Sequence, residues 1–114
     1  LFDGSDKILR DFVNIEDVIQ ANIKACTPKQ NGVYNVGTGE PRSFQDIADI
    51  LQKELGTNLG TEYFPNPYDG YQMHTQADIS ESEKQLEYHP QVTLEQGIKA
   101  YVPEIKRLFE EGVD

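Results

Sequence analysis

The sequence has few residues that could cross-link it or anchor it in a membrane. Its 114 residues include one cysteine, one methionine and no tryptophan. A single cysteine excludes an intrachain disulfide and a cysteine-rich metal site. No apolar run approaches the roughly 20 residues that a membrane-spanning helix requires. We therefore predict one domain that is stabilised by its own core, with Cys26, on an apolar helical face, as part of that core.

Positive charge is also scarce. Ten Lys and Arg residues stand against twenty Asp and Glu residues, so the formal net charge is −10. Such a surface repels polyanions, which excludes a generic binder of nucleic acid or of anionic membranes. A small anion is different, because one well-placed arginine can hold it against an unfavourable overall field.

Several motifs of catalysis and metal binding are missing. There is no G-x-S-x-G sequence and no P-loop, and His74 and His89 share no ligand spacing, so we expect no metal. The sequence GTGEPR at residues 37–42 begins like a dinucleotide fingerprint, but Arg42 stands where the third glycine is required. We interpret it as a tight turn that can line a ligand cleft. The residues alone define no self-contained catalytic site.

The remaining pattern alternates short strands with helices and predicts an α/β fold. Extended segments are expected at residues 10–13, 33–36 and 62–64, and helices from Ile15 to just before Pro28, at 44–55, at 80–88 and at 94–112. The turn-forming sequence PNPYDG at residues 65–70 predicts a surface loop.

Capping signals locate the helix ends. The sequence SFQD from Ser43 is a capping box, and Gly56 is placed as the C-cap of the same helix. A second capping box begins at Thr93, and Ser80 is expected to cap the short helix before it. Pro103 falls inside the last apolar pattern, which predicts a kink or a break into two helices.

Two polar stretches are not explained by core packing or capping. One is the turn Phe2-Asp3-Gly4-Ser5 with Lys7 and Arg10 after it, and the other is the loop at residues 69–78, which contains Tyr71. Arg10 suits either an ion pair with a neighbouring carboxylate, Asp11 or Asp17, or the binding of a phosphate. Tyr71 suits either a packed loop anchor or a ligand contact. Lys7 is assigned to the solvated surface.

Three long segments give the chain a recognisable order. They are RDFVNIEDV at residues 10–18, YNVGTGEPRSFQDIADIL at 34–51 and TQADISESEKQLEYHPQVTLEQGI at 75–98. In sequence and spacing they resemble the C-terminal part of the extended short-chain dehydrogenase/reductases that act on nucleotide sugars. Within that superfamily, LFDGS at 1–5 and GYQMHTQADI at 70–79 are most similar to the ADP-glycero-manno-heptose 6-epimerases.

The resemblance implies the substrate-binding C-terminal domain, residues 1–114, of a larger bacterial cytoplasmic enzyme. That family inverts C6″ of ADP-heptose for lipopolysaccharide core synthesis, by oxidation and re-reduction with NADP. The resemblance places substrate contacts on Phe2, Asp3, Gly4, Ser5, Arg10 and Tyr71. It also implies a homo-oligomer when the enzyme is complete, and no metal.

The family's catalytic Tyr-x-x-x-Lys pair and its NADP-binding loop belong to an N-terminal Rossmann domain. Neither is present in this chain, which begins abruptly and without Met. We therefore expect no catalytic residue here and no activity from the chain alone. Two alternatives stay open: the C-terminal region of a UDP- or dTDP-sugar epimerase or dehydratase of the same superfamily, and a standalone interaction module.

Overall fold

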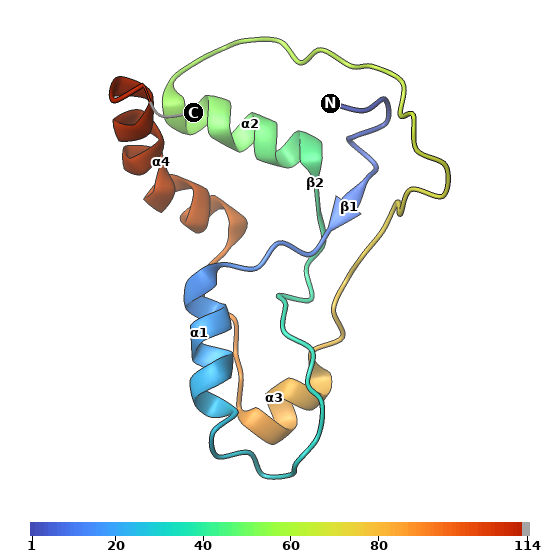
Figure 1. Ribbon diagram of the computed structural model, residues 1–114, viewed down its shortest axis with the longest axis vertical. Coiled ribbons are helices and arrows are strands. Elements are labelled where there is room, and N and C mark those ends of the chain that lie inside the picture. Colours follow the sequence, from blue (N-terminus) through green and yellow to red (C-terminus); the bar gives the residue numbers. More distant parts are fainter. Residues whose placement is uncertain (113–114) are drawn as a thin grey trace.

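The computed structural model describes residues 1–112 as four helices and one very small sheet (Figure 1). The helices are α1 (Ile15–Lys24), α2 (Phe44–Leu55), α3 (Ser80–Leu86) and α4 (Leu94–Glu110), and the strands are β1 (Leu9–Arg10) and β2 (Arg42–Ser43). The two strands pair antiparallel, with Leu9 opposite Ser43 and Arg10 opposite Arg42. The α/β class predicted from the sequence is confirmed. None of the helices in this part of the chain is long and apolar enough to cross a membrane.

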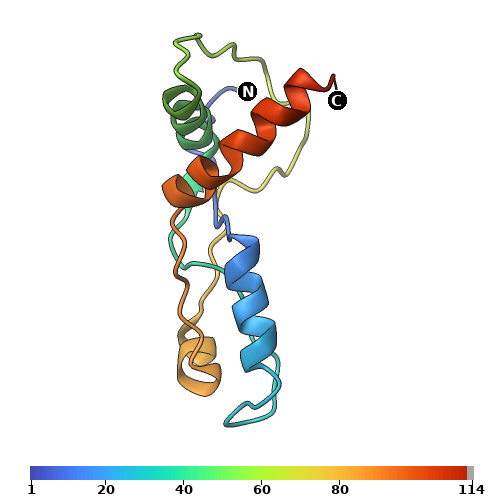
Figure 2. The ribbon, with the colours of Figure 1, turned by 90° about the vertical axis from the view of Figure 1, so that its left-hand side faces the viewer.

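The molecule is flat, with extents of 48 × 37 × 21 Å. Helices α2 and α4 pack together at one end, and α1 and α3 lie at the other (Figures 1 and 2). The β1–β2 pair and the loops beside it connect the two ends. Of the candidate site residues, Arg10 belongs to β1 in this middle region, and Ser5 accepts a hydrogen bond from Gln45 in the first turn of α2.

The capping predictions for α2 and α4 are confirmed. The Ser43 side chain accepts a hydrogen bond from the Asp46 N–H, and Thr93 accepts one from the Gln96 N–H; both capping boxes are complete. Gly56 ends α2 in the left-handed conformation, with φ of 71°. Local sequence was sufficient here because each cap is made within one turn of backbone.

The expected strands are mostly wrong. Of residues 10–13 only Arg10 belongs to a strand, the segment 33–36 pairs with nothing in the described residues, and 62–64 contributes a single bridge between Phe64 and Phe2. Strand β2 was not anticipated. A strand needs a partner, and Val33 is 99% exposed, so the apolar pattern of its segment has no neighbour to pair with.

Three helix details also differ from expectation. Helix α3 ends at Leu86 rather than at residue 88. Ser80 does not cap it; the Asp78 carboxylate instead accepts hydrogen bonds from the N–H and the hydroxyl of Ser80. Helix α4 is not broken at Pro103. Pro103 and Lys99, whose carbonyl loses its N–H partner, are both exposed, so water can replace the missing hydrogen bond.

The apolar stripe of α1 does not face the core. Ile15, Ile19 and Ile23 are 65%, 44% and 67% exposed. Cys26 is exposed as well, contrary to prediction. The helix instead turns Asp17 and Ala21 inward, and both are nearly fully buried. The sequence did not reveal that residues 1–112 leave this apolar stripe uncovered.

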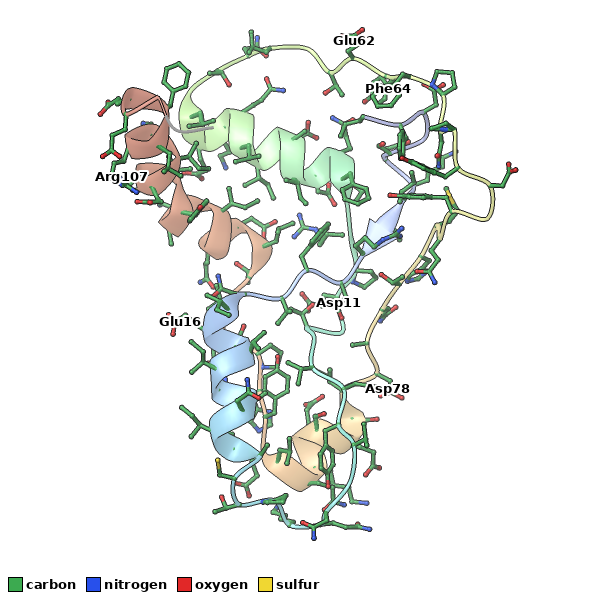
Figure 3. All side chains as sticks on the ribbon, in the orientation of Figure 1. Asp11, Glu16, Glu62, Phe64, Asp78 and Arg107 are labelled. Carbon is green, nitrogen blue, oxygen red and sulfur yellow. The ribbon has the colours of Figure 1, made fainter. Side chains whose placement is uncertain are left out.

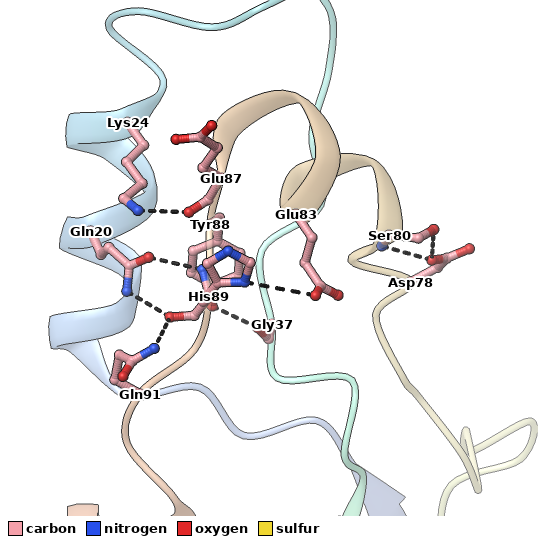
Figure 4. A network of polar contacts seen from close by, with 10 residues as sticks. All are labelled: Gln20, Lys24, Gly37, Asp78, Ser80, Glu83, Glu87, Tyr88, His89 and Gln91. Atoms are coloured by element: carbon pink, nitrogen blue, oxygen red, sulfur yellow. Dashed lines mark hydrogen bonds and ion pairs between the residues drawn. The ribbon is translucent and has the colours of Figure 1, made fainter.

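The inner face of α1 is held by the segment that follows α3. Gln20 exchanges two hydrogen bonds with the backbone of His89, and Lys24 donates to the Glu87 carbonyl at 2.6 Å (Figure 4). Tyr88 is fully buried beside them and donates its hydroxyl to the Gly37 carbonyl at 2.6 Å. Polar contacts thus tie three segments around a small apolar cluster that contains Ala21, Ile79, Leu86 and Tyr88.

Candidate functional site

The first residues form a tight turn that is attached to a distant segment. The Asp3 N–H donates to the Phe64 carbonyl at 2.8 Å, and the Phe64 N–H donates to Leu1 at 3.0 Å. Gly4 has φ of 78°, a conformation that glycine adopts without strain. Ser5 is 1% exposed, and its hydroxyl donates to the Phe2 carbonyl within the turn. Asp3 and Gly4 are exposed.

Strand β1 brings Arg10 next to the loop that carries Tyr71. The Leu9 N–H donates to the Met73 carbonyl at 2.8 Å, and the Thr75 N–H donates to the Leu9 carbonyl at 3.0 Å. The loop therefore runs alongside β1, on the opposite side from β2. The guanidinium carbon of Arg10 lies 5.2 Å from the centre of the Tyr71 ring and 5.8 Å from that of Phe44, which is cation–π geometry.

Phe2 connects this arginine–tyrosine pair to the opening turn. Its ring meets Tyr71 edge to face with centres 5.5 Å apart, and it meets Phe64 and Tyr68 in the same manner at 5.2 and 6.0 Å. The structure thus brings Phe2, Arg10 and Tyr71 into one cluster, with Asp3, Gly4 and Ser5 in the adjoining turn. Phe64 and Tyr68 belong to the same surface and were not singled out from the sequence.

The charge of Arg10 is not neutralised within the described residues. No carboxylate of residues 1–112 forms an ion pair with it, and its one side-chain hydrogen bond is to its neighbour's carbonyl, Leu9, at 2.9 Å. Arg42, directly opposite on β2, differs: it pairs with Asp46 at 3.2 Å and with Glu95 at 2.6 Å. Arg10 therefore has hydrogen-bond donors left for an anion.

The two carboxylates considered as partners of Arg10 are used elsewhere. Asp17 accepts from the Gln91 N–H at 2.8 Å and from the Val92 N–H at 3.1 Å. Asp11, which Figure 3 shows near the centre of the molecule, accepts from the Thr38 N–H and hydroxyl and from the Gly39 and Ala77 N–H groups. The ion-pair interpretation of Arg10 is therefore wrong for this structure.

Sequence reasoning missed Asp11. Its partial burial raises its pKa, but the four hydrogen bonds outweigh burial, so its pKa lies below the ordinary value of 3.8. The only signal was the turn Gly37-Thr38-Gly39, whose N–H groups need an acceptor. Nothing local in the sequence pairs that turn with a carboxylate 27 residues earlier.

An apolar groove of about 540 Å³ lies away from these residues, between the start of α1 and helices α2 and α4. Its lining includes Phe12, Leu51, Leu94, Ile98, Tyr101 and Ile105, and none of the six candidate site residues. The groove offers no charged group suited to a phosphate. Within residues 1–112, no group of three or more His, Cys, Asp or Glu side chains is arranged to hold a metal ion.

No family model matches the sequence. A search of curated proteins finds the ADP-L-glycero-D-manno-heptose-6-epimerase of Brachyspira hyodysenteriae, which is 35% identical over 111 residues. The match spans 94% of this chain but only 35% of that protein. The chain therefore spans about one third of the length of the curated relative.

Solved structures give the same result. The Helicobacter pylori ADP-L-glycero-D-manno-heptose-6-epimerase superposes with a TM-score of 0.79 at 46% identity, over 89% of this chain and 31% of that one. The UDP-glucose 4-epimerase of Thermotoga maritima, solved with UDP-glucose, has a TM-score of 0.85 at 28% identity, over 96% of this chain and 35% of that one. In sequence and in fold, this chain is thus a relative of the nucleotide-sugar epimerases and corresponds to about one third of such an enzyme.

Proposed function

We propose that this chain is the substrate-binding domain of a nucleotide-sugar epimerase and that its ligand is ADP-glycero-manno-heptose. The observation that carries the proposal is Arg10, whose guanidinium stacks on Tyr71 beside Phe2 and has no carboxylate partner among residues 1–112. With a net charge of −10, the surface as a whole repels a diphosphate. A diphosphate ligand therefore needs a local cation, and the planar guanidinium binds phosphate oxygens in pairs.

The neighbouring residues have complementary roles in this proposal. Stacking on Tyr71 holds the guanidinium of Arg10 in one orientation, while the tyrosine hydroxyl is a donor for a phosphate or sugar oxygen. The ring of Phe2 and the backbone of the turn through Asp3 and Gly4 contact the nucleotide base or the sugar. Ser5 supports the turn through its hydroxyl bond to Phe2.

ADP-heptose is preferred because two epimerases of that name, 35% and 46% identical, match this chain. A UDP-sugar is the second candidate, because the Thermotoga maritima structure with UDP-glucose superposes with a TM-score of 0.85. The choice between nucleotides depends on base contacts, and both classes share the diphosphate that Arg10 would bind.

The exposed apolar stripe of α1 supports the proposal that this chain is part of a larger protein. An apolar stripe such as that of Ile15, Ile19 and Ile23 on a helix normally packs against another surface. The relatives are about three times as long as this chain, and one is a UDP-glucuronic acid 4-epimerase of Bacillus cereus solved with NAD. We propose that a dinucleotide-binding domain covers this face and supplies the catalytic tyrosine and lysine together with a nicotinamide cofactor, which the family resemblance implies is NADP.

The test uses the complete gene product and calorimetric titration with ADP and with UDP. ADP should bind more tightly than UDP. Arg10→Ala should weaken ADP binding by about 2–4 kcal/mol, the usual loss at a buried charged contact, or roughly 30- to 1,000-fold. Lys7→Ala removes the same charge three residues away and should change the dissociation constant less than about twofold.

Each other outcome has a definite meaning. Tighter binding of UDP would favour the UDP-sugar alternative, and unchanged binding by Arg10→Ala would remove this residue from the site. If the complete gene encodes no glycine-rich strand–turn–helix and its product binds no nucleotide, the interaction module remains. The 114 residues alone should not epimerise ADP-heptose, because they contain no Tyr-x-x-x-Lys pair.

A further inference from the structure

Asp11 is the residue at which three separate segments meet. One carboxylate oxygen accepts from the Thr38 N–H at 2.8 Å and from the Thr38 hydroxyl at 2.6 Å. The other accepts from the Gly39 N–H at 2.9 Å and from the Ala77 N–H at 3.1 Å. Both oxygens are thus occupied by donors from two loops that are far apart in the sequence.

The hydrogen bonds of Asp11 connect the segment that carries Arg10 with the loop that carries Tyr71. Asp11 directly follows Arg10, and Ala77 lies six residues after Tyr71 in the loop at residues 69–78. The Gln76 amide donates to the Gly39 carbonyl at 2.7 Å, which joins the same two loops a second time. The loop that carries Tyr71 is therefore held against residues 9–11 by two successive anchors. The first is the pairing of Leu9 with Met73 and Thr75, and the second, two residues further along, is the bond between Ala77 and the Asp11 carboxylate.

The surroundings of Asp11 require both its shape and its charge. A Cβ atom on Gly37 would lie 2.7 Å from the carboxylate and 2.7 Å from the Ala77 side chain, so only glycine permits this approach. An asparagine in place of Asp11 would keep one oxygen but direct an NH₂ group at N–H donors. At least one backbone donor would then lose its acceptor.

We propose that Asp11 is a positioning residue of the nucleotide-sugar site, which holds the Tyr71 loop against Arg10 without touching the ligand. The inference rests on the proposed function, because it assumes that Arg10 and Tyr71 bind the nucleotide sugar. It goes further by assigning part of the site's geometry to a side chain whose hydrogen bonds go to Thr38, Gly39 and Ala77.

The test is a double-mutant cycle on the complete gene product, with the dissociation constant of ADP as the readout. Asp11→Asn should weaken ADP binding about tenfold, a loss within the range of coupled neighbouring residues. In a Tyr71→Ala background the same substitution should cause no further loss. A residue with only a structural role would lower the melting temperature but reduce affinity by the same factor in both backgrounds, or not at all.

Two further variants complete the design. Asp78→Asn removes an equal charge from an exposed carboxylate whose partner within residues 1–112 is Ser80, and should leave ADP affinity unchanged. If Asp11→Asn does not fold, Thr38→Val takes its place, because it removes the hydroxyl that donates to the Asp11 carboxylate and keeps the Thr38 N–H. Thr38→Val should weaken ADP binding less than Asp11→Asn does, and it should cause no further loss in the Tyr71→Ala background.

The outcomes separate the two proposals. If Arg10→Ala and Tyr71→Ala weaken ADP binding while neither Asp11→Asn nor Thr38→Val does, the positioning role is wrong and the proposed function stands. If none of these variants changes ADP affinity, the proposed function itself is wrong.

Discussion

The guanidinium carbon of Arg10 lies 5.2 Å from the centre of the Tyr71 ring, 61 positions further along the chain. The two arginines that face each other in the β1–β2 pair differ in their partners. Arg42 forms ion pairs with Asp46 and Glu95, whereas Arg10 forms none within residues 1–112. A free guanidinium that is already stacked loses less side-chain entropy when it binds an anion than a freely rotating one.

The first prediction concerns the shape of that cation. Arg10→Lys keeps the positive charge but loses the planar donor pair and the stacking on Tyr71, so ADP affinity should fall about tenfold. The unfolding free energy should fall by no more than about 1 kcal/mol, because Arg10 loses its stacking on Tyr71 but has no ion pair to lose within residues 1–112. Calorimetric titration and denaturant unfolding measure the two quantities. Affinity equal to that of the unsubstituted protein would show that a point charge is sufficient.

Gly37 should tolerate no side chain. Gly37→Ala places a methyl group 2.7 Å from both the Asp11 carboxylate and the Ala77 side chain, so it should lower the unfolding free energy by about 1–3 kcal/mol. Gly60→Ala is the matched control, because a Cβ there meets nothing within 4 Å. It should be neutral or slightly stabilising. Equal stability of the two variants in urea would contradict the packing around Asp11.

Acid should remove the contribution of Asp11. Its folded pKa lies below 3.8, so the folded state binds this proton less readily than the unfolded chain does. The contribution to stability is complete above about pH 3.8 and is lost as the pH falls through the folded pKa. Asp46, whose pKa is lowered chiefly by the Ser43 N–H, titrates in the same direction.

A comparison of variants therefore isolates Asp11 from Asp46. The melting temperature of the unsubstituted protein should exceed that of Asp11→Asn by a constant amount from neutral pH down to about pH 5. The difference should shrink below about pH 3.8. A gap that stays constant into strong acid would show that the carboxylate is not favoured by its four donors.

Tyr88 should behave as a buried phenol. Burial, with the nearby carboxylates of Asp17 and Asp11, raises its pKa to about 12. It therefore stays mostly protonated at about pH 11, where an ordinary tyrosine is ionised. Tyr88→Phe should leave the phenolate absorbance at that pH unchanged, provided the protein stays folded. A decrease equivalent to one phenolate would place the Tyr88 ring in solvent.

The same substitution tests the bond to Gly37. Removing the hydroxyl leaves the Gly37 carbonyl without its donor, which should lower the unfolding free energy by about 1–2 kcal/mol. Tyr68→Phe, on a ring that is 65% exposed, should change it by less than about 0.5 kcal/mol.

The exposed stripe of α1 gives a prediction about context. Ile19→Gln should cost about 1–3 kcal/mol in the complete gene product if another domain buries this side chain, and close to nothing in the 114-residue chain. Leu59→Gln, at a site that is 72% exposed and outside the stripe, should have little effect in both. Thermal unfolding of the four proteins decides the matter, and equal effects of Ile19→Gln in both contexts would refute the proposed interface.

The sequence predicted the features that depend on neighbouring residues and missed those that depend on contacts between distant segments. The capping boxes at Ser43 and Thr93 and the turn at Gly56 depend on neighbours within a few residues, and each was predicted correctly. The partner of β1 depends on which distant segment pairs with it, and the sequence did not reveal that Arg42 would. Asp17 shows the same limit: it reads as an ordinary first-turn acid, yet it is buried and bonds to Gln91 and Val92.

The candidate site follows the same division. The residues alone left Arg10 as either an ion-pair partner or an anion-binding residue. The resemblance to a family selected anion binding, together with Tyr71 and the opening turn. Neither source revealed the contact between Arg10 and Tyr71 or the role of Asp11. Those relations depend on backbone pairing between Leu9 and residues 73–75, for which the sequence has no local signal.

The long span of these pairings also has a kinetic consequence. Asp11 reaches Ala77 across 66 positions, and Asp17 reaches Val92 across 75. Closing such loops costs entropy before any contact repays it, and chains dominated by distant pairings fold slowly for their size. During synthesis, Asp11 and Asp17 therefore wait until residues 77 and 92 have been made, whereas the capping contacts of helix α2 lie within its own sequence.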